Sequence, residues 1–168
     1  MRVFAIDPGN EQSAWVLYDS ARPIAFGKHG NDEALYLAKV YRTGGTHLAI
    51  EMIASYGMPV GREVFETCVW IGRFVQAWDA PHALVYRRDV KLHLCGSSRA
   101  KDGNVRTALL DRYGGKAAAL GTKAAPGPLR GVSSDVWSAL AVAVTFSDLR
   151  AATGKLGGNA LFPESGQS

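Results

Sequence analysis

Two short apolar runs in the sequence each end in a carboxylate, and this pattern restricts the fold more than any other feature. Residues 2–6 end at Asp7, immediately before a Pro-Gly turn, and the run at 47–52 carries Glu51 near its end. A charge at the end of a buried strand is costly unless something pairs with it. If the two strands are neighbours, both carboxylates meet at one end of a sheet.

The order of the segments that follow predicts an α/β fold. The β-rich runs at 13–18 and 22–28 follow the first strand through tight turns, which indicates three consecutive antiparallel strands. Asn31 or Asp32 is expected to cap a helix that continues to about Arg42. Later helices are expected at about 59–78, from Asp102 or Asn104 to Tyr113 and at about 134–152, with a fifth strand at 82–87. This order predicts a mixed sheet with helices on both faces.

Length and composition favour one domain. The 168 residues, 47% of them hydrophobic, are enough for one buried core. We expect the domain to occupy residues 1–153 and a disordered tail to occupy 154–168. No apolar run approaches the roughly 18 residues of a membrane helix. The two cysteines, Cys68 and Cys95, suit a reducing compartment, so we expect an intracellular, cytoplasmic protein with no membrane partner.

Positive charge is concentrated in one part of the chain. Residues 87–130 carry a net charge of +7, whereas the rest of the chain carries −3. Affinity for a polyanion comes largely from the counterions that such cationic groups release, so this distribution favours binding to a nucleic-acid backbone. Within this segment, 114–131 is rich in Gly, Ala, Pro and Lys, has no convincing period, and is expected to form a flexible basic loop.

A third carboxylate, Asp135, opens the last expected helix behind Ser133 and Ser134. A helix that starts near the strand ends can bring Asp135 to Asp7 and Glu51. Three converging carboxylates repel one another unless a cation lies between them. Oxygen ligands favour Mg²⁺ or Mn²⁺, and two such ions about 4 Å apart could support phosphodiester hydrolysis. Taken singly, each acid also has an ordinary explanation: an Asx turn, an ion pair with Arg, or an interaction with a helix dipole.

Four segments, taken in order, carry a resemblance to a known family. They are AIDPG at 5–9, LAIEMI at 48–53, RRDVKLHLCGSSRAKDGNVRTALL at 87–110 and SSDVWSALAVAV at 133–144. Over about residues 1–150 the chain resembles the RuvC family of Holliday junction resolvases, in the ribonuclease H-like superfamily. The resemblance implies an α/β, ribonuclease H-like mixed five-stranded sheet. It also implies a bacterial or phage-encoded homodimer that uses carboxylates and Mg²⁺, with Mn²⁺ as a substitute, to nick opposed strands of a four-way DNA junction.

The resemblance implies roles for individual residues. Asp7, Glu51 and Asp135 match the metal-binding carboxylates of the family, and Lys101 matches a lysine of the catalytic site. Ser138 stands where the family usually has a second aspartate in the final helix, and serine is a poor direct ligand for Mg²⁺. Because Ser138 follows Asp135 by three residues, both share one helical face, and Ser138 could act on the metal site through a water or a ligand.

The expected DNA contacts lie mainly in the basic segment. The resemblance places Lys91 and Lys101 at the rim of the active site, against phosphates of the cleaved strand. Tyr56 is the candidate for stacking on an unpaired base. The broad apolar surface of the 59–78 helix suits either a dimer interface or burial against the sheet and other helices. Further backbone contacts are expected from Arg87, Arg88, Arg99, Arg106 and Lys116.

Three alternatives compete with this hypothesis. A ribonuclease H type enzyme could use the same acids on the RNA strand of a hybrid duplex. A non-catalytic junction-binding protein is the second alternative, if Ser138 marks a lost metal site. A sugar-kinase or actin-like nucleotide site also begins with a strand, an Asp and a Gly turn, but it needs a duplicated domain, for which 168 residues are too few.

Overall fold

The first 30 residues form the antiparallel strands that their apolar pattern predicts. In the computed structural model, β1 (Arg2–Asp7), β2 (Gln12–Asp19) and β3 (Arg22–Gly30) pair in order. β4 (Thr46–Met52) and β5 (His82–Tyr86) extend the sheet on the other side of β1 and run parallel to it. The strand order is β3-β2-β1-β4-β5, so the predicted mixed five-stranded sheet is confirmed.

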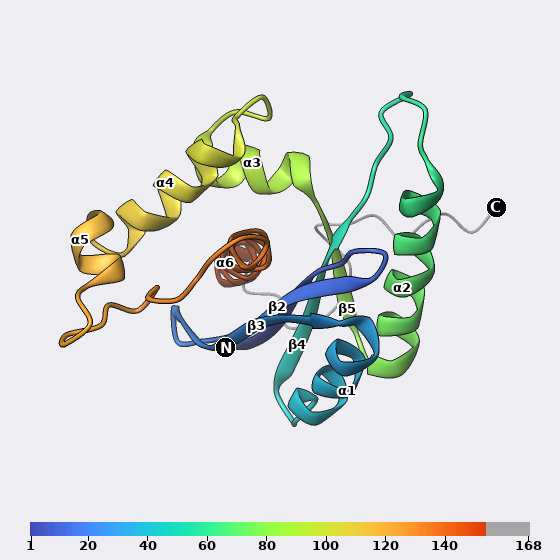
Figure 1. Ribbon diagram of the computed structural model, residues 1–168, viewed down its shortest axis with the longest axis horizontal. Helices are drawn as coiled ribbons and strands as arrows, with labels where there is room; N and C mark the ends of the chain where they lie inside the picture. The colour runs from blue at the N-terminus through green and yellow to red at the C-terminus, as the bar shows by residue number, and fades with distance from the viewer. Residues whose placement is uncertain (154–168) are drawn as a thin grey trace.

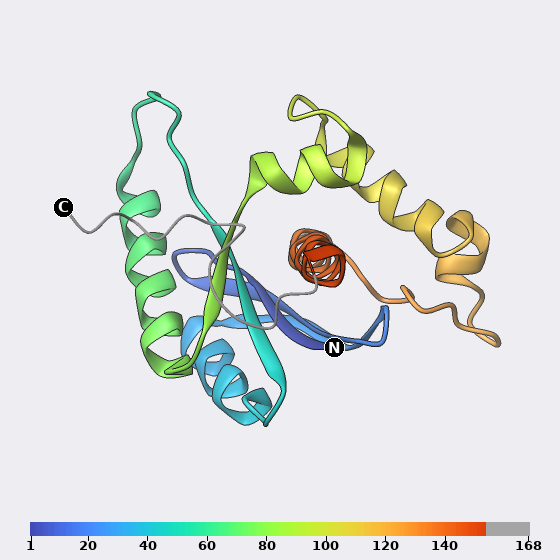
Figure 2. The ribbon, with the colours of Figure 1, turned by 180° about the vertical axis from the view of Figure 1, so that it is seen from behind.

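The structure describes residues 1–153, and the predicted tail at 154–168 lies outside the described residues. Helices cover both faces of the sheet (Figure 1, and from behind in Figure 2). On one face lie α1 (Asn31–Tyr41) and α2 (Arg62–Trp78), and on the other lies α6 (Val136–Thr153). Outside α6 lie α3 (Arg87–Cys95), α4 (Asp102–Arg112) and α5 (Gly115–Leu120). Within these 153 residues, no helix has the length and apolar character to cross a membrane.

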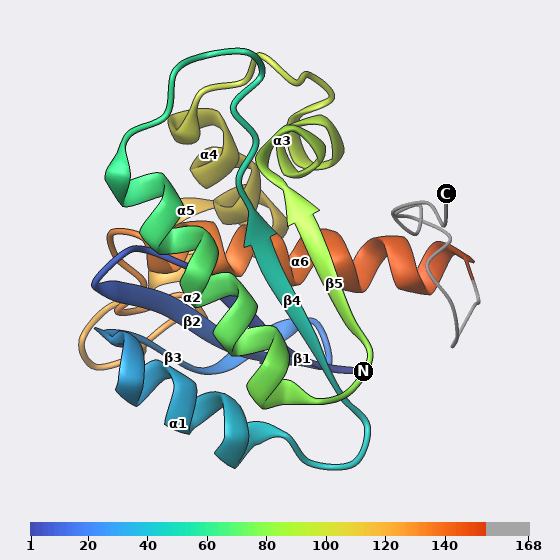
Figure 3. The ribbon, with the colours of Figure 1, turned by 90° about the vertical axis from the view of Figure 1, so that its right-hand side faces the viewer.

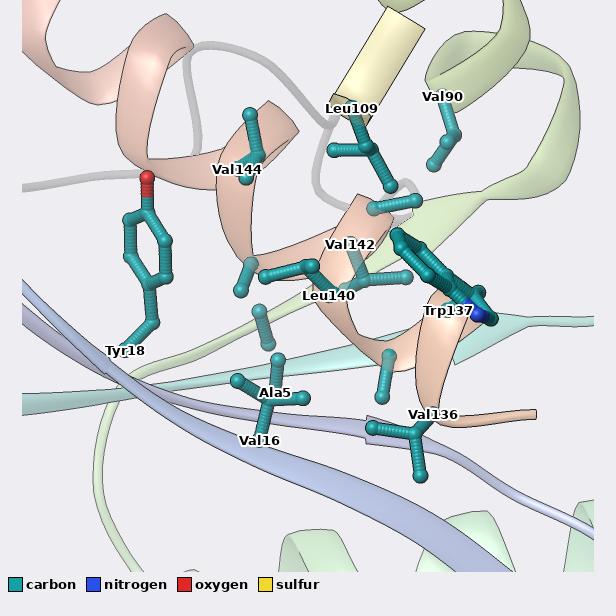
Figure 4. Close-up of a cluster of buried hydrophobic side chains, with 14 of the residues drawn as sticks. Ala5, Val16, Tyr18, Val90, Leu109, Val136, Trp137, Leu140, Val142 and Val144 are labelled. Atoms are coloured by element: carbon teal, nitrogen blue, oxygen red, sulfur yellow. The ribbon is translucent and has the colours of Figure 1, made fainter. Parts of the chain in front are cut away.

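Alternate side chains of the strands fill two cores. Phe4 and Ile6 of β1 pack with Phe74 and Trp78 on the face of α1 and α2. The intervening residues face α6, and Figure 4 shows side chains of β1 and β2 meeting those of α6 there. On its outer side α6 contacts Val90 of α3 and Leu109 of α4, both from the same core. Because α6 is covered on both sides, most of its circumference is apolar. Its predicted inward residues Val136, Ala139, Leu140, Ala143 and Val144 are all buried.

The start of α1 differs from the prediction. Gly30 is the N-cap of α1, and not Asn31 or Asp32. The Asn31 side chain is buried and already engaged: Ser13 Oγ donates to Asn31 Oδ1 at 2.6 Å, and Asn31 Nδ2 donates to the Gly9 carbonyl at 2.9 Å. The residue that was expected to cap the helix therefore ties the helix to the turn after β1.

The region from 59 to 95 contains two further differences. α2 begins at Arg62, so Pro59 lies outside its first turn. The structure also forms α3 at residues 87–95, which the sequence prediction left without a helix. Only Val90 of this helix is fully buried, so its apolar pattern is too sparse to stand out among the charged residues.

The predicted flexible basic loop at 114–131 is wrong. Residues 115–120 form α5, and a bridge pairs Gly121 with Pro126. Ala119 and Leu129 are completely buried in the core around α6. Tertiary contacts therefore order a segment whose Gly-rich composition suggests flexibility.

Candidate active site

β1 and β4 bring two carboxylates together at one end of the sheet. The strands are parallel neighbours in which Ile6 pairs with Ile50, and Asp7 and Glu51 each follow one residue later. Because side chains alternate between the faces of a sheet, both carboxylates point away from the buried face of Ile6 and Ile50 and toward α6. The expectation that these two acids meet is confirmed.

The turn that follows Asp7 is held by close packing and hydrogen bonds. A Cβ atom at Gly9 would lie 2.4 Å from the Gln12 carbonyl oxygen, so any other residue there would force the turn to move. Asn31 closes the turn from α1, because its side chain donates to the Gly9 carbonyl and its backbone N–H donates to the Glu11 carbonyl at 3.0 Å. These contacts fix where β1 ends and thereby position the Asp7 carboxylate.

Burial and mutual repulsion raise the pKa of both carboxyl groups. Burial is the main cause for Asp7, the Glu51 charge comes next, and with a smaller effect of Asp135 the pKa of Asp7 rises to about 7. The Arg87 charge and, to a smaller extent, the Ser138 hydroxyl lower the pKa of Asp7 and oppose this rise. Burial also raises the pKa of Glu51, against the opposing charge of Arg87. The cations of the chain therefore compensate these two acids only in part.

Asp135 reaches this region from the residue before α6. Its Oδ2 accepts a hydrogen bond from Lys28 Nζ of β3 at 2.5 Å. Lys28 lies in the same cross-strand row as Asp7, because Ala14 of β2 pairs with Asp7 on one side and with Lys28 on the other. Sequence reasoning missed Lys28. The alternation of β3 is the available signal, but a β-bulge in the β2–β3 hairpin shifts it.

Arg87, the first residue of α3, connects Glu51 to a further acid. Its Nη1 lies 3.3 Å from Glu51 Oε2, and its Nη2 donates to Asp102 Oδ1 at 2.8 Å. One helical turn later, Lys91 Nζ lies 3.7 Å from the same Asp102 oxygen. The hydrogen bond from Arg87 holds the pKa of Asp102 below its usual value. Arg87 and Lys91, both expected to contact DNA, thus lie at the carboxylates, and Asp102 was expected only as a helix cap.

The other expected DNA contacts lie outside this cluster. Arg106 packs its guanidinium over the Trp137 ring, 4.9 Å from the ring centroid. Tyr56, 62% exposed, lies in the segment between β4 and α2. Figure 3 shows this segment and the turn between α3 and α4 extending beyond the end of the sheet at which β4 ends. Exposed positions on and between the outer helices α3, α4 and α5 are held by Arg88, Arg99, Lys101, Arg106 and Lys116.

The chemistry of the site suits a hard divalent cation. Asp7 and Glu51 offer carboxylate oxygens, the donors that Mg²⁺ and Mn²⁺ prefer, and their raised pKa values reflect negative charge that lacks full compensation. Within residues 1–153, however, no three His, Cys, Asp or Glu side chains are arranged to hold a metal ion. The metal-ligand roles of Asp7, Glu51 and Asp135 stay predictions.

Comparison with known proteins gives matches among solved structures and none by sequence. No protein-family model and no curated protein match the sequence. Among solved structures, the Thermus thermophilus RuvC structure aligns with 92% of this chain and 97% of that chain, with a TM-score of 0.63 and 20% identity. T. thermophilus RuvC in complex with a Holliday junction substrate aligns with 92% of this chain and 96% of that chain, with a TM-score of 0.60 and 19% identity. The chain therefore has the ribonuclease H-like fold of RuvC, as its sequence motifs predict.

Proposed function

We propose that the chain is a metal-dependent endonuclease that resolves four-way DNA junctions, or other branched DNA, by nicking opposed strands. The observation that carries the proposal is the pair of carboxylates, Asp7 and Glu51, at the ends of adjacent parallel strands in a RuvC-like fold. One of the similar structures is a complex with a Holliday junction substrate, which supports branched DNA as the ligand.

The residues of the cluster have distinct tasks in this proposal. Asp7 and Glu51 would hold Mg²⁺, or Mn²⁺ in its place, while Asp135 completes the cluster from the start of α6. A bound divalent ion supplies an activated water and stabilises the leaving oxygen of a phosphodiester. The Ser138 hydroxyl lowers the pKa of Asp7 and would orient its carboxylate. Arg87 does the same for Glu51, which its guanidinium contacts at 3.3 Å.

The cations around the cluster would position the DNA. Lys91, beside Asp102, and Lys101, the exposed residue before α4, would meet phosphates of the cleaved strand. Tyr56, exposed beyond the end of β4, is available to stack on an unpaired base. Further contacts to the DNA backbone would come from Arg87, Arg88, Arg99, Arg106 and Lys116.

Symmetric cutting requires two sites at a fixed separation, which a homodimer supplies. On α2, Phe65 and Val69 follow one another by one helical turn and are 62% and 63% exposed. Large apolar side chains that face solvent at this spacing support a dimer interface on α2.

The test compares nicking of a synthetic four-way junction, a linear duplex, a splayed fork and an RNA–DNA hybrid, with each strand labelled in turn. We expect paired nicks in opposed strands of the junction with Mg²⁺. Asp7→Asn should reduce nicking by more than the roughly 10- to 100-fold lost when a partner of a metal ligand is removed. It should leave junction affinity within about threefold of wild type, because phosphate contacts supply most of that affinity. Asp32→Asn, on the opposite face, is the matched control.

Each alternative has its own outcome. A preference for the hybrid, with cuts in the RNA strand, would favour a ribonuclease H type enzyme. Junction binding without nicking in Mg²⁺, Mn²⁺ or Ca²⁺ would favour a non-catalytic binding protein. Nicking by Asp7→Asn at the wild-type rate would remove Asp7 from the chemistry.

A further inference from the structure

The sequence analysis did not predict Lys28 as a site residue, yet Lys28 lies beside the proposed metal site. Its ammonium contacts Asp135 across 107 residues of sequence. The row Lys28, Ala14, Asp7 crosses three strands on the face of α6, and the small side chain of Ala14 lies between the two charged residues. The ammonium and Asp135 thus meet on the same sheet face as Asp7 and Glu51.

The exposure of this ion pair argues against a role in folding alone. The side chains of Lys28 and Asp135 are 37% and 49% exposed. Ion pairs exposed to this degree contribute little to stability, because solvent screens them and both side chains lose freedom. A function in the site explains the contact better.

Two of the three acids at the site pair with a cation of the chain. Asp7 and Glu51 end neighbouring parallel strands, and Asp135 lies directly before α6, which packs on the same face of the sheet. Arg87 pairs with Glu51, and Lys28 pairs with Asp135. Among residues 1–153, no cation lies within ion-pair distance of Asp7.

Ser138, in the first turn of α6, adds no charge beside Asp135, which directly precedes this helix. One hydrated Mg²⁺ typically needs only one or two carboxylates from the protein. Asp7 and Glu51 meet that need, whereas a second ion would have to displace the Lys28 ammonium from Asp135.

We propose that Lys28 takes the place of a second metal ion: it holds the Asp135 carboxylate and leaves Asp7 and Glu51 to bind a single divalent ion. Lys28 is a positioning residue in this scheme, since it acts through Asp135. The inference rests on the proposed function and specifies how many ions that site uses.

The experiment counts bound Mn²⁺ ions by following the EPR signal of free Mn²⁺ during titration of the concentrated, DNA-free protein. We expect one ion per chain in the wild type and two in Lys28→Met, which removes the ammonium, frees Asp135 as a ligand and keeps an unbranched side chain that is one atom shorter. Lys39→Met, an exposed position on α1, is the matched control and should bind one ion. Asp135→Asn should bind one Mn²⁺ ion with an affinity within about threefold of the wild-type value. The affinity of Asp7→Asn for Mn²⁺ should fall by at least about 10-fold.

Two ions in the wild type, one ion in Lys28→Met, or an equal loss of affinity in Asp135→Asn and Asp7→Asn would each overturn the inference. Circular dichroism checks the fold, and if Lys28→Met does not fold, Asp135→Asn decides the question. A chain that binds one Mn²⁺ but nicks no junction contradicts the proposed function alone. A chain that nicks junctions with two ions bound contradicts this inference alone, and one that binds none contradicts both.

Discussion

Asp7 links the stability of the protein to pH. Its pKa rises from 3.8 in the unfolded chain to about 7, so between these values the folded chain holds a proton that the unfolded chain has lost. The resulting contribution to stability is complete below about pH 4 and disappears as the pH rises through about 7. Asp7→Asn removes this titration and keeps the shape of the side chain. Without metal, we therefore expect the variant to melt above the wild type at about pH 8 and to lose this advantage at about pH 5.

Thermal melts in EDTA at the two pH values measure the effect. A chain of this size shifts its melting temperature by roughly 2–4 °C for each kcal/mol, so a difference of several degrees is measurable. Added Mg²⁺ should raise the melting temperature of the wild type and leave that of Asp7→Asn unchanged, because only the wild type keeps both ligands. A constant difference between the two proteins at both pH values would contradict the raised pKa.

Gly9 sets the direction in which β1 ends. A methyl group there meets the Gln12 carbonyl oxygen at 2.4 Å, so Gly9→Ala forces the turn after Asp7 to move. We expect a loss of about 1–3 kcal/mol in the free energy of unfolding, as for other overpacked sites, together with reduced nicking. Urea unfolding measures the first effect. Gly44→Ala is the matched control, since a Cβ at that position meets nothing within 4 Å, and it should leave both properties unchanged.

At the scale of single elements, the exposed apolar face of α2 leads to a prediction about dimer formation. Phe65 and Val69 are mostly exposed, so replacing both with Glu should leave the fold intact and separate the proposed dimer into monomers. Analytical ultracentrifugation measures the mass of the particle. In the variant, nicks in a junction should no longer occur in pairs on opposed strands. The matched control replaces Tyr36 and Val40 of α1, which are also exposed, with Glu. A variant of α2 that remains dimeric would place the interface elsewhere.

The elements that the sequence predicts are those whose pattern depends on burial against the sheet. The run at 2–6 alternates because β1 packs on both faces, and the last helix is apolar because α6 is covered on both sides. α3 escapes prediction because only Val90 of its nine residues is fully buried and its N-cap, Tyr86, makes no side-chain capping bond. α5 escapes because Gly114 and Gly115, both with positive φ, suggest a loop, while the packing of Ala119 decides otherwise.

In the candidate site, too, the residues marked by a local sequence pattern are predictable, and the residue positioned by tertiary structure is not. Asp7 and Glu51 are predictable because each closes an apolar run and parallel neighbours align their ends. Lys28 is not, because the β2–β3 register depends on a bulge between Leu17 and Tyr18. Counted from the turn, an unbroken hairpin would pair Ala14 with Gly27 and turn Lys28 to the opposite face. The bulge moves the partner of Ala14 to Lys28 and so brings the ammonium to the acids.

At the scale of the whole molecule, acids and cations occupy the same side. The carboxylates lie at the end of β1 and β4 on the face of α6, and α3, α4 and α5, which belong to the basic segment 87–130, lie outside α6 on that face (Figure 1). The opposite face carries α1 and α2. A DNA backbone that follows the basic segment would therefore pass close to the acids, while α2 stays free to meet a second copy of the chain.

This arrangement predicts different salt responses for cations on the two faces. Lys101 is exposed at the start of α4, on the basic side, whereas Lys39 is exposed on α1. If Lys101 contacts a phosphate, Lys101→Ala should lower the slope of log affinity against log salt by about 0.9, the value for one lost contact with duplex DNA. It should also slow nicking, because the proposed function assigns to this lysine a phosphate of the cleaved strand. Junction-binding titrations across a salt series measure the slope. Lys39→Ala should keep the wild-type slope, and an equal slope in both variants would exclude Lys101 from the DNA interface.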